Sequence, residues 1–182
     1  MARGEVFHGA FGVACEYGHM TLVPDGRRCA CGNRGCWEMY ASGRALARDA
    51  RELAVESPVA AAGMLELAGG VEGLTGPIVT QAAAAGDAAA RSICTAVGRW
   101  LGRGLASLAA IIDPSVFVIG GGVIEAGELL LGPAREEFAG SLPGRGFRPL
   151  ARVVAAELGP DAGLVGAADL ARVFTRPGEP AS

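Results

Sequence analysis

A histidine and three cysteines lie within one short stretch of the chain, HMTLVPDGRRCACGNRGCWE, at positions 19–38. The four side chains are His19, Cys29, Cys31 and Cys36, in the pattern H-x9-C-x-C-x4-C. An imidazole and three thiolates form the ligand set of a closed, tetrahedral zinc site, and thiolates favour zinc over magnesium or calcium. We expect no fifth ligand nearby and no open coordination position. The pattern therefore predicts a structural zinc that orders a segment poor in hydrophobic residues.

Two other interpretations of these cysteines stay open. The thiols can be ordinary surface groups beside an unrelated histidine, although their clustering argues against this. A redox pair is disfavoured, because Cys-x-Cys differs from the thioredoxin-type Cys-x-x-Cys. Cys15 lies near the cluster but is not expected to be a ligand, and Cys94 falls on the apolar side of a predicted helix, as a small core residue does.

Two carboxylates flank the candidate metal ligands. Glu16 precedes His19 by three residues, and Glu38 follows Cys36 by two. A metal that holds His19 and Cys36 would bring these carboxylates near one another. Carboxylates accept paired hydrogen bonds from neighbouring sugar hydroxyls, so a sugar site is one interpretation. The other is that both are plain surface acids, as most glutamates are.

Composition narrows the class of protein. The chain has 182 residues, of which 51% are hydrophobic and 19% charged, with a net charge of −3; this predicts a folded domain rather than disorder. Its arginines form no basic stripe, so we expect no nucleic-acid partner. No apolar run is long enough for a membrane span, and the N-terminus lacks a signal-peptide core. With five cysteines, an odd number, these features predict a cytoplasmic protein without a disulfide framework.

Hydrophobic periodicity predicts strands that alternate with helices, and hence an α/β domain with a largely parallel sheet. The expected strands are Thr21–Val23, Ser115–Ile119 (buried on both faces, before three glycines) and the segment Ala151–Leu158. Three helices are expected to begin at Ser42, at Ser57-Pro58 and at Thr75-Gly76-Pro77. A longer helix is expected from an Asp87 cap to Asp113-Pro114, with glycines at 98, 102 and 104 for close packing. Two more are expected at Ala126–Phe138 and Asp161–Phe174. RPGEPAS is expected to be a frayed tail.

Several motifs together resemble one known family. The segments CEYGHM and CACGNRGCWE resemble the E-x-G-H and C-x-C-G-x-x-G-C-x-E signature of the ROK family of sugar kinases and repressors. The segments YASGRALARDARELA, DPSVFVIGGGV and LGPDAGLVGAADLA are also similar to that family. Within it, the resemblance is strongest to the ATP-dependent glucokinases of actinobacteria. The cysteine signature is specific, whereas a glycine triplet alone is a weak signal.

The resemblance implies an actin-like, RNase H-like ATPase fold, of which this chain is the C-terminal lobe of a two-lobe sugar kinase. It implies that Glu16, His19 and Glu38 contact glucose or a related hexose. The zinc ligands implied are His19, Cys29, Cys31 and Cys36, with His19 using one ring nitrogen for the metal and the other for the sugar. Gly120, Gly121 and Gly122 match nucleotide-side glycines, where missing side chains let the backbone approach ATP, which acts with Mg²⁺. A homodimer is also implied.

The chain departs from that family in one large respect. Family kinases open with a D-x-G-x-T phosphate loop, an N-D aspartate that acts as general base and a G-T-G-x-G-G loop, and none of these occurs here. We therefore expect no catalytic residue in this chain and an absent N-terminal lobe, with Met1 just beyond that last loop. Residues 1–40 are expected to form a zinc and sugar segment, 41–176 the rest of the lobe, and 177–182 a tail.

The resulting hypothesis is the C-terminal portion of an ATP-dependent glucokinase, which transfers the ATP γ-phosphate to the 6-hydroxyl of glucose. Phosphoryl transfer depends on positioning and charge stabilisation, so the isolated chain is expected to be inactive or nearly so. A smaller departure is Cys15, where the family usually has glycine. The alternative is the sugar-sensing domain of a ROK-family transcriptional repressor, which would carry a helix-turn-helix upstream.

Overall fold

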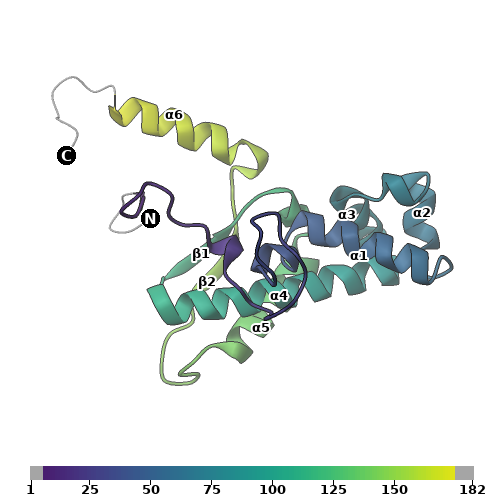
Figure 1. Ribbon diagram of the computed structural model, residues 1–182, viewed down its shortest axis with the longest axis horizontal. Coiled ribbons are helices and arrows are strands. Elements are labelled where there is room, and N and C mark those ends of the chain that lie inside the picture. Colours follow the sequence, from purple (N-terminus) through teal and green to yellow (C-terminus); the bar gives the residue numbers. More distant parts are fainter. Residues whose placement is uncertain (1–5, 175–182) are drawn as a thin grey trace.

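The structure is a computed structural model that describes residues 6–174, and a long helix, α4, runs lengthwise through it (Figure 1). Helices α1, α2 and α3 gather around the N-terminal end of α4, and the two strands lie toward its other end. The helices are α1 (Gly43–Glu56), α2 (Ala62–Ala68), α3 (Gly76–Ala84), α4 (Ala88–Ile112), α5 (Glu128–Ser141) and α6 (Ala162–Phe174). Short 3-10 turns occupy Tyr17–His19, Trp37–Met39, Val71–Gly73, Gly122–Ala126 and Gly159–Asp161.

The strands β1 (Val116–Ile119) and β2 (Arg152–Ala155) pair in parallel, and α5 lies between them in sequence. This β-α-β arrangement confirms the prediction of an α/β fold with a parallel sheet. The expectation that the first of these strands is buried on both faces was wrong. Phe117 packs edge-on against Phe138 of α5, with ring centroids 5.8 Å apart, whereas its neighbour Val118 points to the opposite face and is 61% exposed. Helix α5 therefore covers only one face of the strand.

Side-chain caps set the start of two helices, as expected. The Ser42 hydroxyl accepts a hydrogen bond from the Ala45 amide at 3.2 Å and begins α1. The Asp87 carboxylate accepts one from the Ala90 amide at 2.8 Å and begins α4. Such caps satisfy backbone donors that have no partner inside the helix. Helix α4 ends where Asp113 adopts a left-handed conformation (φ 42°).

Three expected elements differ in the structure. No helix begins at Ser57-Pro58, because the Ser57 carbonyl accepts hydrogen bonds from the Ala60 and Ala61 amides in a tight turn. Helix α2 begins only after this turn. Residues 21–23 form a single bridge to Cys36 rather than a strand. There, the amides of residues 22 and 23 both donate to one carbonyl, that of Gly35, which interrupts the ladder. The helix expected at 126–138 is displaced to α5, and the final strand is only β2. The tail 176–182 lies outside the described residues.

Glycines on α4 allow two other elements to come close, as predicted. A Cβ atom at Gly98 or Gly102 would collide with backbone carbonyls of α5. A Cβ atom at Gly104 would collide with the indole ring of Trp37, which is buried and belongs to the segment after the last cysteine. Alpha-helix α4 is therefore the support against which both α5 and the cysteine-bearing segment pack.

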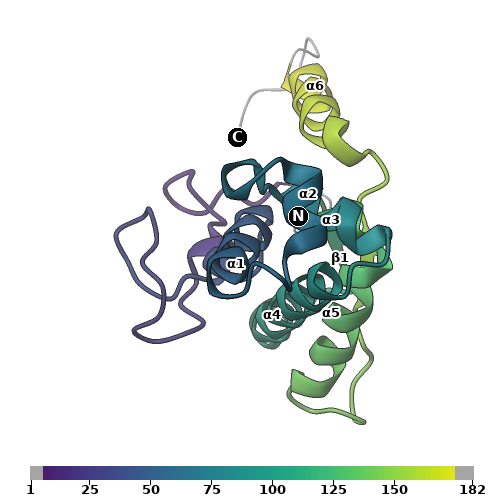
Figure 2. The same cartoon turned by 90° about the vertical axis from the view of Figure 1, so that its right-hand side faces the viewer.

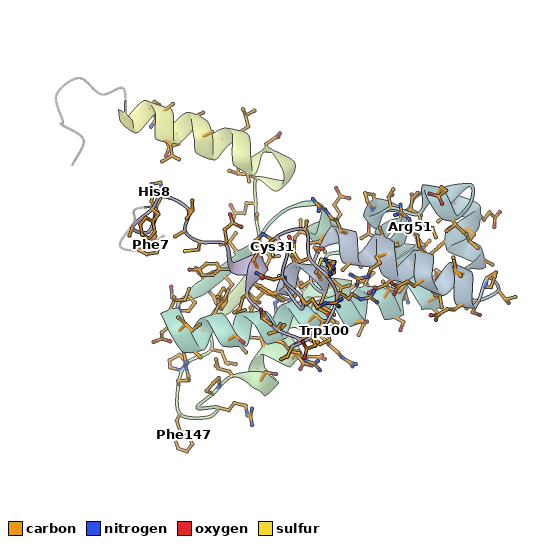
Figure 3. The ribbon with its side chains drawn as sticks, viewed as in Figure 1. Phe7, His8, Cys31, Arg51, Trp100 and Phe147 are labelled. Atoms are coloured by element: carbon orange, nitrogen blue, oxygen red, sulfur yellow. The ribbon has the colours of Figure 1, made fainter. Side chains whose placement is uncertain are left out.

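Helix α6 projects away from the rest of the described chain in both orthogonal views (Figures 1 and 2). Its Leu164 is 74% exposed. A second large apolar side chain, Phe147, points outward from the turn that follows α5 (Figure 3). Among the described residues, no helix combines the length and the apolar character needed to cross a membrane.

The substitution Gly104→Ala should lower the free energy of unfolding. The added methyl would press into the Trp37 ring, and overpacking of this kind costs about 1–3 kcal/mol. The gain of about 1 kcal/mol for alanine over glycine in a helix offsets only part of that cost. Urea unfolding measures the difference. Gly132→Ala in α5 is the matched control, because a Cβ there meets nothing within 4 Å, and it should leave stability unchanged or raise it. Equal stability of the two variants would contradict the packing argument.

Candidate metal centre and sugar site

The cysteine-bearing segment folds back on itself as a narrow ribbon, and Figure 2 shows this part of the chain on one side of the helices. Two isolated antiparallel bridges hold the ribbon together, Thr21 with Cys36 and Arg28 with Arg34. Gly35 has a φ of 76°, and a Cβ atom there would collide with the Val23 carbonyl. Only glycine fits this crossing point without strain.

The ribbon brings the four predicted metal ligands together. One ligand atom from each of His19, Cys29, Cys31 and Cys36 lies within 4.8 Å of all the others. The Cys29 Sγ is 3.6 Å from His19 Nδ1, and the Cys31 Sγ is 3.5 Å from the Cys36 Sγ. Bond lengths of about 2.3 Å to sulfur and about 2.0 Å to nitrogen in a tetrahedron place neighbouring ligand atoms about 3.5–3.8 Å apart. The residues therefore fit a zinc ion in both chemistry and spacing.

The three thiols of the cluster differ in their affinity for protons. A backbone hydrogen bond from Asn33 keeps the pKa of Cys31 below its usual value. A backbone hydrogen bond from Cys31 also favours the Cys29 thiolate, but the Glu38 carboxylate and burial outweigh it and raise the pKa of Cys29 to about 12. Burial is the main cause of the raised pKa of Cys36. Metal binding at neutral pH therefore has to release protons from Cys29 and Cys36.

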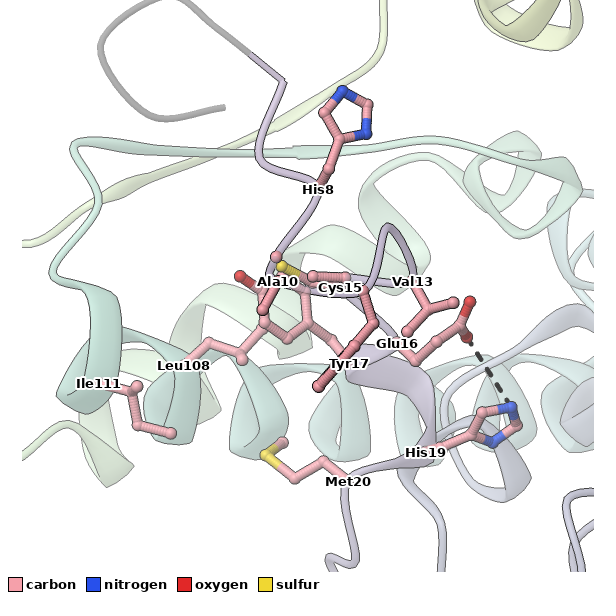
Figure 4. Close-up of a pocket in the computed structure, with 13 residues that line it drawn as sticks. His8, Ala10, Val13, Cys15, Glu16, Tyr17, His19, Met20, Leu108 and Ile111 are labelled. Atoms are coloured by element: carbon pink, nitrogen blue, oxygen red, sulfur yellow. Dashed lines mark ion pairs between the residues drawn. The ribbon is translucent and has the colours of Figure 1, made fainter. Parts of the chain in front are cut away.

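The two predicted carboxylates lie on either side of His19. Glu38 Oε1 is 3.6 Å from His19 Nδ1, and Glu16 Oε2 is 3.8 Å from His19 Nε2 (Figure 4). The structure thus brings together all three predicted sugar contacts. The Cys29 thiol also donates a hydrogen bond to Glu38 Oε1 at 3.0 Å, so this carboxylate lies directly beside the cysteine cluster. Spacing in sequence hides this, since the 3-10 turn Trp37–Met39 swings the carboxylate back toward the ribbon.

An open cavity of about 580 Å³ lies beside Glu16 and His19. The N-terminal segment forms one wall, and Leu108 and Ile111 of α4 form part of the other (Figure 4). Cys15 also lines this cavity and is exposed, and a hydrogen bond with it raises the pKa of Tyr17. The sequence carried no signal for the α4 residues in this wall, because they lie about ninety positions further along the chain.

A second cavity, of about 550 Å³, contains the predicted glycine triplet. Gly120, Gly121 and Gly122 line it together with Gly43 and Gly76, the first residues of α1 and α3. Backbone amides at helix N-termini attract anions, and the exposed Arg44 adds a positive charge to the same wall. Sequence reasoning found the triplet but missed the other residues, which come from two separate helices.

Comparison with known proteins identifies the family of this chain. The sequence model described as "ROK family" matches residues 1–173. The chain belongs to the ROK family. Its fold is that of the ROK sugar kinases, an actin-like ATPase fold, and superposition on a ROK glucokinase from Streptomyces griseus, solved with glucose and AMPPNP, gives a TM-score of 0.88 with 51% identity. That superposition covers 93% of this chain and 55% of the Streptomyces griseus chain.

Relatives within the ROK family include both enzymes and regulators. The glucokinase of Streptomyces coelicolor is 49% identical over 165 residues, which cover 90% of this chain and 52% of that protein. The N-acetylglucosamine repressor of Escherichia coli O6:H1 is 31% identical over 158 residues, covering 87% of this chain and 37% of that protein. The chain thus spans about half the length of the glucokinases that it matches.

In the folded chain, Cys94 should resist alkylation whereas Cys15 reacts. Burial within α4 raises the pKa of Cys94 to about 11, so only about 1% of its thiol is ionised at pH 9, and the thiolate is the reactive form. Cys15 is exposed. Iodoacetamide labelling at pH 7 and pH 9, followed by peptide mass spectrometry, measures both sites. Labelling in guanidinium chloride is the control in which both react, and equal rates in the folded chain would refute the assigned burial.

Proposed function

We propose that this chain is the sugar-binding and nucleotide-side part of an ATP-dependent glucokinase, which transfers the ATP γ-phosphate to the 6-hydroxyl of glucose. The observation that carries the proposal is the placement of Glu16 and Glu38 on the two sides of His19, next to the cysteine cluster. The glucokinases among its relatives, and the glucose in the Streptomyces griseus complex, support the choice of sugar.

In this proposal the two carboxylates accept hydrogen bonds from adjacent sugar hydroxyls, and the His19 imidazole lies between them. Its Nδ1 lies 3.6 Å from both Cys29 Sγ and Glu38 Oε1, and its Nε2 faces Glu16, so we assign Nδ1 to the metal and Nε2 to the sugar. Zinc would be held by His19 and the three cysteines at 29, 31 and 36. Bound there, it supplies structural support rather than chemistry, because four protein ligands close its coordination sphere.

The second cavity is the proposed nucleotide side. The turn after β1, with its glycine triplet at 120–122, lets backbone amides approach phosphates closely. The N-termini of α1 and α3 stabilise negative charge by their dipoles, and Arg44 can pair with a phosphate oxygen. ATP would enter as its Mg²⁺ complex. The AMPPNP bound by the Streptomyces griseus glucokinase supports this assignment.

Phosphoryl transfer itself needs groups that we do not assign to this chain. A general base on the sugar hydroxyl contributes about 10²–10⁴-fold to such reactions, and alignment of the γ-phosphate contributes further. The chain offers sugar contacts and a nucleotide-side loop but no D-x-G-x-T or G-T-G-x-G-G segment. We therefore propose that the 182 residues alone bind the sugar without turning it over.

A second candidate is the sugar-sensing domain of a transcriptional repressor. The observation in its favour is the 31% identity to an N-acetylglucosamine repressor over most of this chain. The higher identity to glucokinases, 49%, favours the kinase. The two candidates differ in the sugar they should prefer, glucose for the kinase and N-acetylglucosamine for such a repressor.

Zinc content tests the metal part of the proposal. The purified chain should hold about one zinc ion per molecule, measured by plasma mass spectrometry. Cys31→Ser and Cys36→Ser should lower zinc affinity by more than about 100-fold, because loss of a mere outer-shell partner already costs about 10–100-fold. Cys15→Ser is the matched control and should retain the metal, since Cys15 is outside the cluster. Equal zinc content in all three variants would rule out the assigned ligands.

Glucose binding tests the sugar part. Glu38→Gln should weaken glucose binding to the zinc-loaded chain about 10- to 100-fold, because a hydrogen bond to a charged group contributes about 1.5–3 kcal/mol. Calorimetric titration measures this, with Glu66→Gln in α2 as the control on an exposed glutamate far in sequence from the site. A preference for N-acetylglucosamine over glucose would favour the repressor candidate instead.

The same preparation, mixed with ATP, Mg²⁺ and glucose, should form glucose 6-phosphate at less than about a thousandth of the rate of a full-length glucokinase, given the missing base and phosphate loops. The full-length Streptomyces coelicolor enzyme is the positive control. Comparable turnover by the two proteins would show that the chain contains catalytic groups that we have not assigned.

A further inference from the structure

The cysteine ribbon between its paired ends, residues 21–35, is a segment with little core of its own, and we call it the metal loop. Most of its side chains are exposed, although Cys29 is buried and Leu22 packs half-buried against the hydrophobic core. Such a segment is ordered only where specific contacts hold it, because few buried apolar groups offset its conformational entropy. Its contacts with the helices therefore decide how firmly the metal ligands are positioned.

Arg27 makes the hydrogen bonds of the loop to the helical part of the chain, whereas Leu22 near the start of the loop packs half-buried against the hydrophobic core. Its guanidinium donates two hydrogen bonds to the Glu52 carboxylate of α1, at 2.7 and 2.6 Å. Its backbone amide donates to the Tyr40 hydroxyl at 2.8 Å. Beyond the cysteines and the paired ends of the loop, the hydrogen bonds that join residues 21–35 to the rest of the described chain all come from Arg27.

Glu52 and Tyr40, the two groups that accept hydrogen bonds from Arg27, are themselves held by contacts with the helices. The Tyr40 ring lies 4.9 Å from the Trp100 ring of α4, centroid to centroid. Arg48 lies 3.9 Å from Glu52 on the same face of α1, and it also donates to the Met39 carbonyl. A planar, bidentate pair between arginine and a carboxylate has one favoured geometry. The pair therefore holds the Arg27 side chain in one position as well as neutralising its charge.

We infer that Arg27, Glu52 and Tyr40 form a clamp that positions the metal loop and slows the release of zinc. The inference rests on the proposed zinc site. Arg27 stands two residues before Cys29, so a loop freed at Arg27 would carry the Cys29 thiol away from His19, which is now 3.6 Å distant. The three clamp residues touch neither metal nor sugar, and they act through Cys29 as positioning residues.

The rate of zinc transfer to a coloured chelator, 4-(2-pyridylazo)resorcinol, tests the clamp. The full 182-residue chain is loaded with zinc, and its zinc content is measured first. Release should be about five-fold faster in Arg27→Gln, Glu52→Gln and Tyr40→Phe than in the unaltered chain, a ratio that corresponds to about 1 kcal/mol. The double variant R27Q/E52Q should release zinc no faster than either single variant, since each one already breaks the same pair.

The matched control is Glu128→Gln, which breaks an ion pair of equal length, Glu128 with Arg135 in α5 at 2.6 Å. It should release zinc at the unaltered rate. Salt supplies a second readout that a general loss of stability would not reproduce. Raising the salt concentration should speed release from the unaltered chain by screening the exposed pair, and should have less effect on R27Q and E52Q. Circular dichroism establishes that each variant is folded, and Tyr40→Phe, which removes one oxygen, keeps the test open should the charge variants fail to fold.

Unchanged release rates in folded, zinc-bearing clamp variants would overturn the clamp and leave the proposed zinc site standing. Equal acceleration by Glu128→Gln would also overturn it, because release would then follow overall stability. An unaltered chain that holds no zinc would overturn the proposed metal site and the clamp together. The zinc content measured at the start separates this last case from the other two.

Discussion

The packing of the Trp37 ring against Gly104 of α4 is the contact on which the rest of the site depends. The ring is buried, and its Nε1 donates to the Trp100 carbonyl at 2.8 Å. The residues before and after it are Cys36, a candidate metal ligand, and Glu38, a candidate sugar contact. One anchored side chain thus fixes the start and end of a short turn, so that both of these groups take their positions from the long helix.

Helix α4 also links the two cavities. Near its C-terminal end it lines the wall opposite Glu16 and His19, and the chain then passes directly into β1 and the glycine triplet of the second cavity. Helices α1 and α3 pack on α4 and present their N-termini to that second cavity. The proposed sugar side and the proposed nucleotide side thereby share one rigid element, an arrangement that would hold two bound molecules at a fixed separation.

The parts of this structure that local patterns determine could be predicted from sequence. The candidate metal ligands fall within one short stretch, and the Ser42 and Asp87 caps bind amides only three positions away. Features set by packing could not be. The partners Arg27 and Glu52 stand 25 residues apart, and neither carries a local signal. The exposure of Val118 depends on which face of the strand α5 covers, and periodicity alone does not state this.

Both tryptophans of the chain, Trp37 and Trp100, lie where the segment after the last cysteine packs on α4. Trp37 is shielded from water, whereas Trp100 is flanked by the Tyr40 ring and by the Arg103 guanidinium, 4.6 Å from its centroid. The tryptophan fluorescence of the protein therefore originates at this one junction, and the sheet, α5 and α6 contribute none of it. Changes in that fluorescence would report directly on the packing of the segment after the last cysteine against α4.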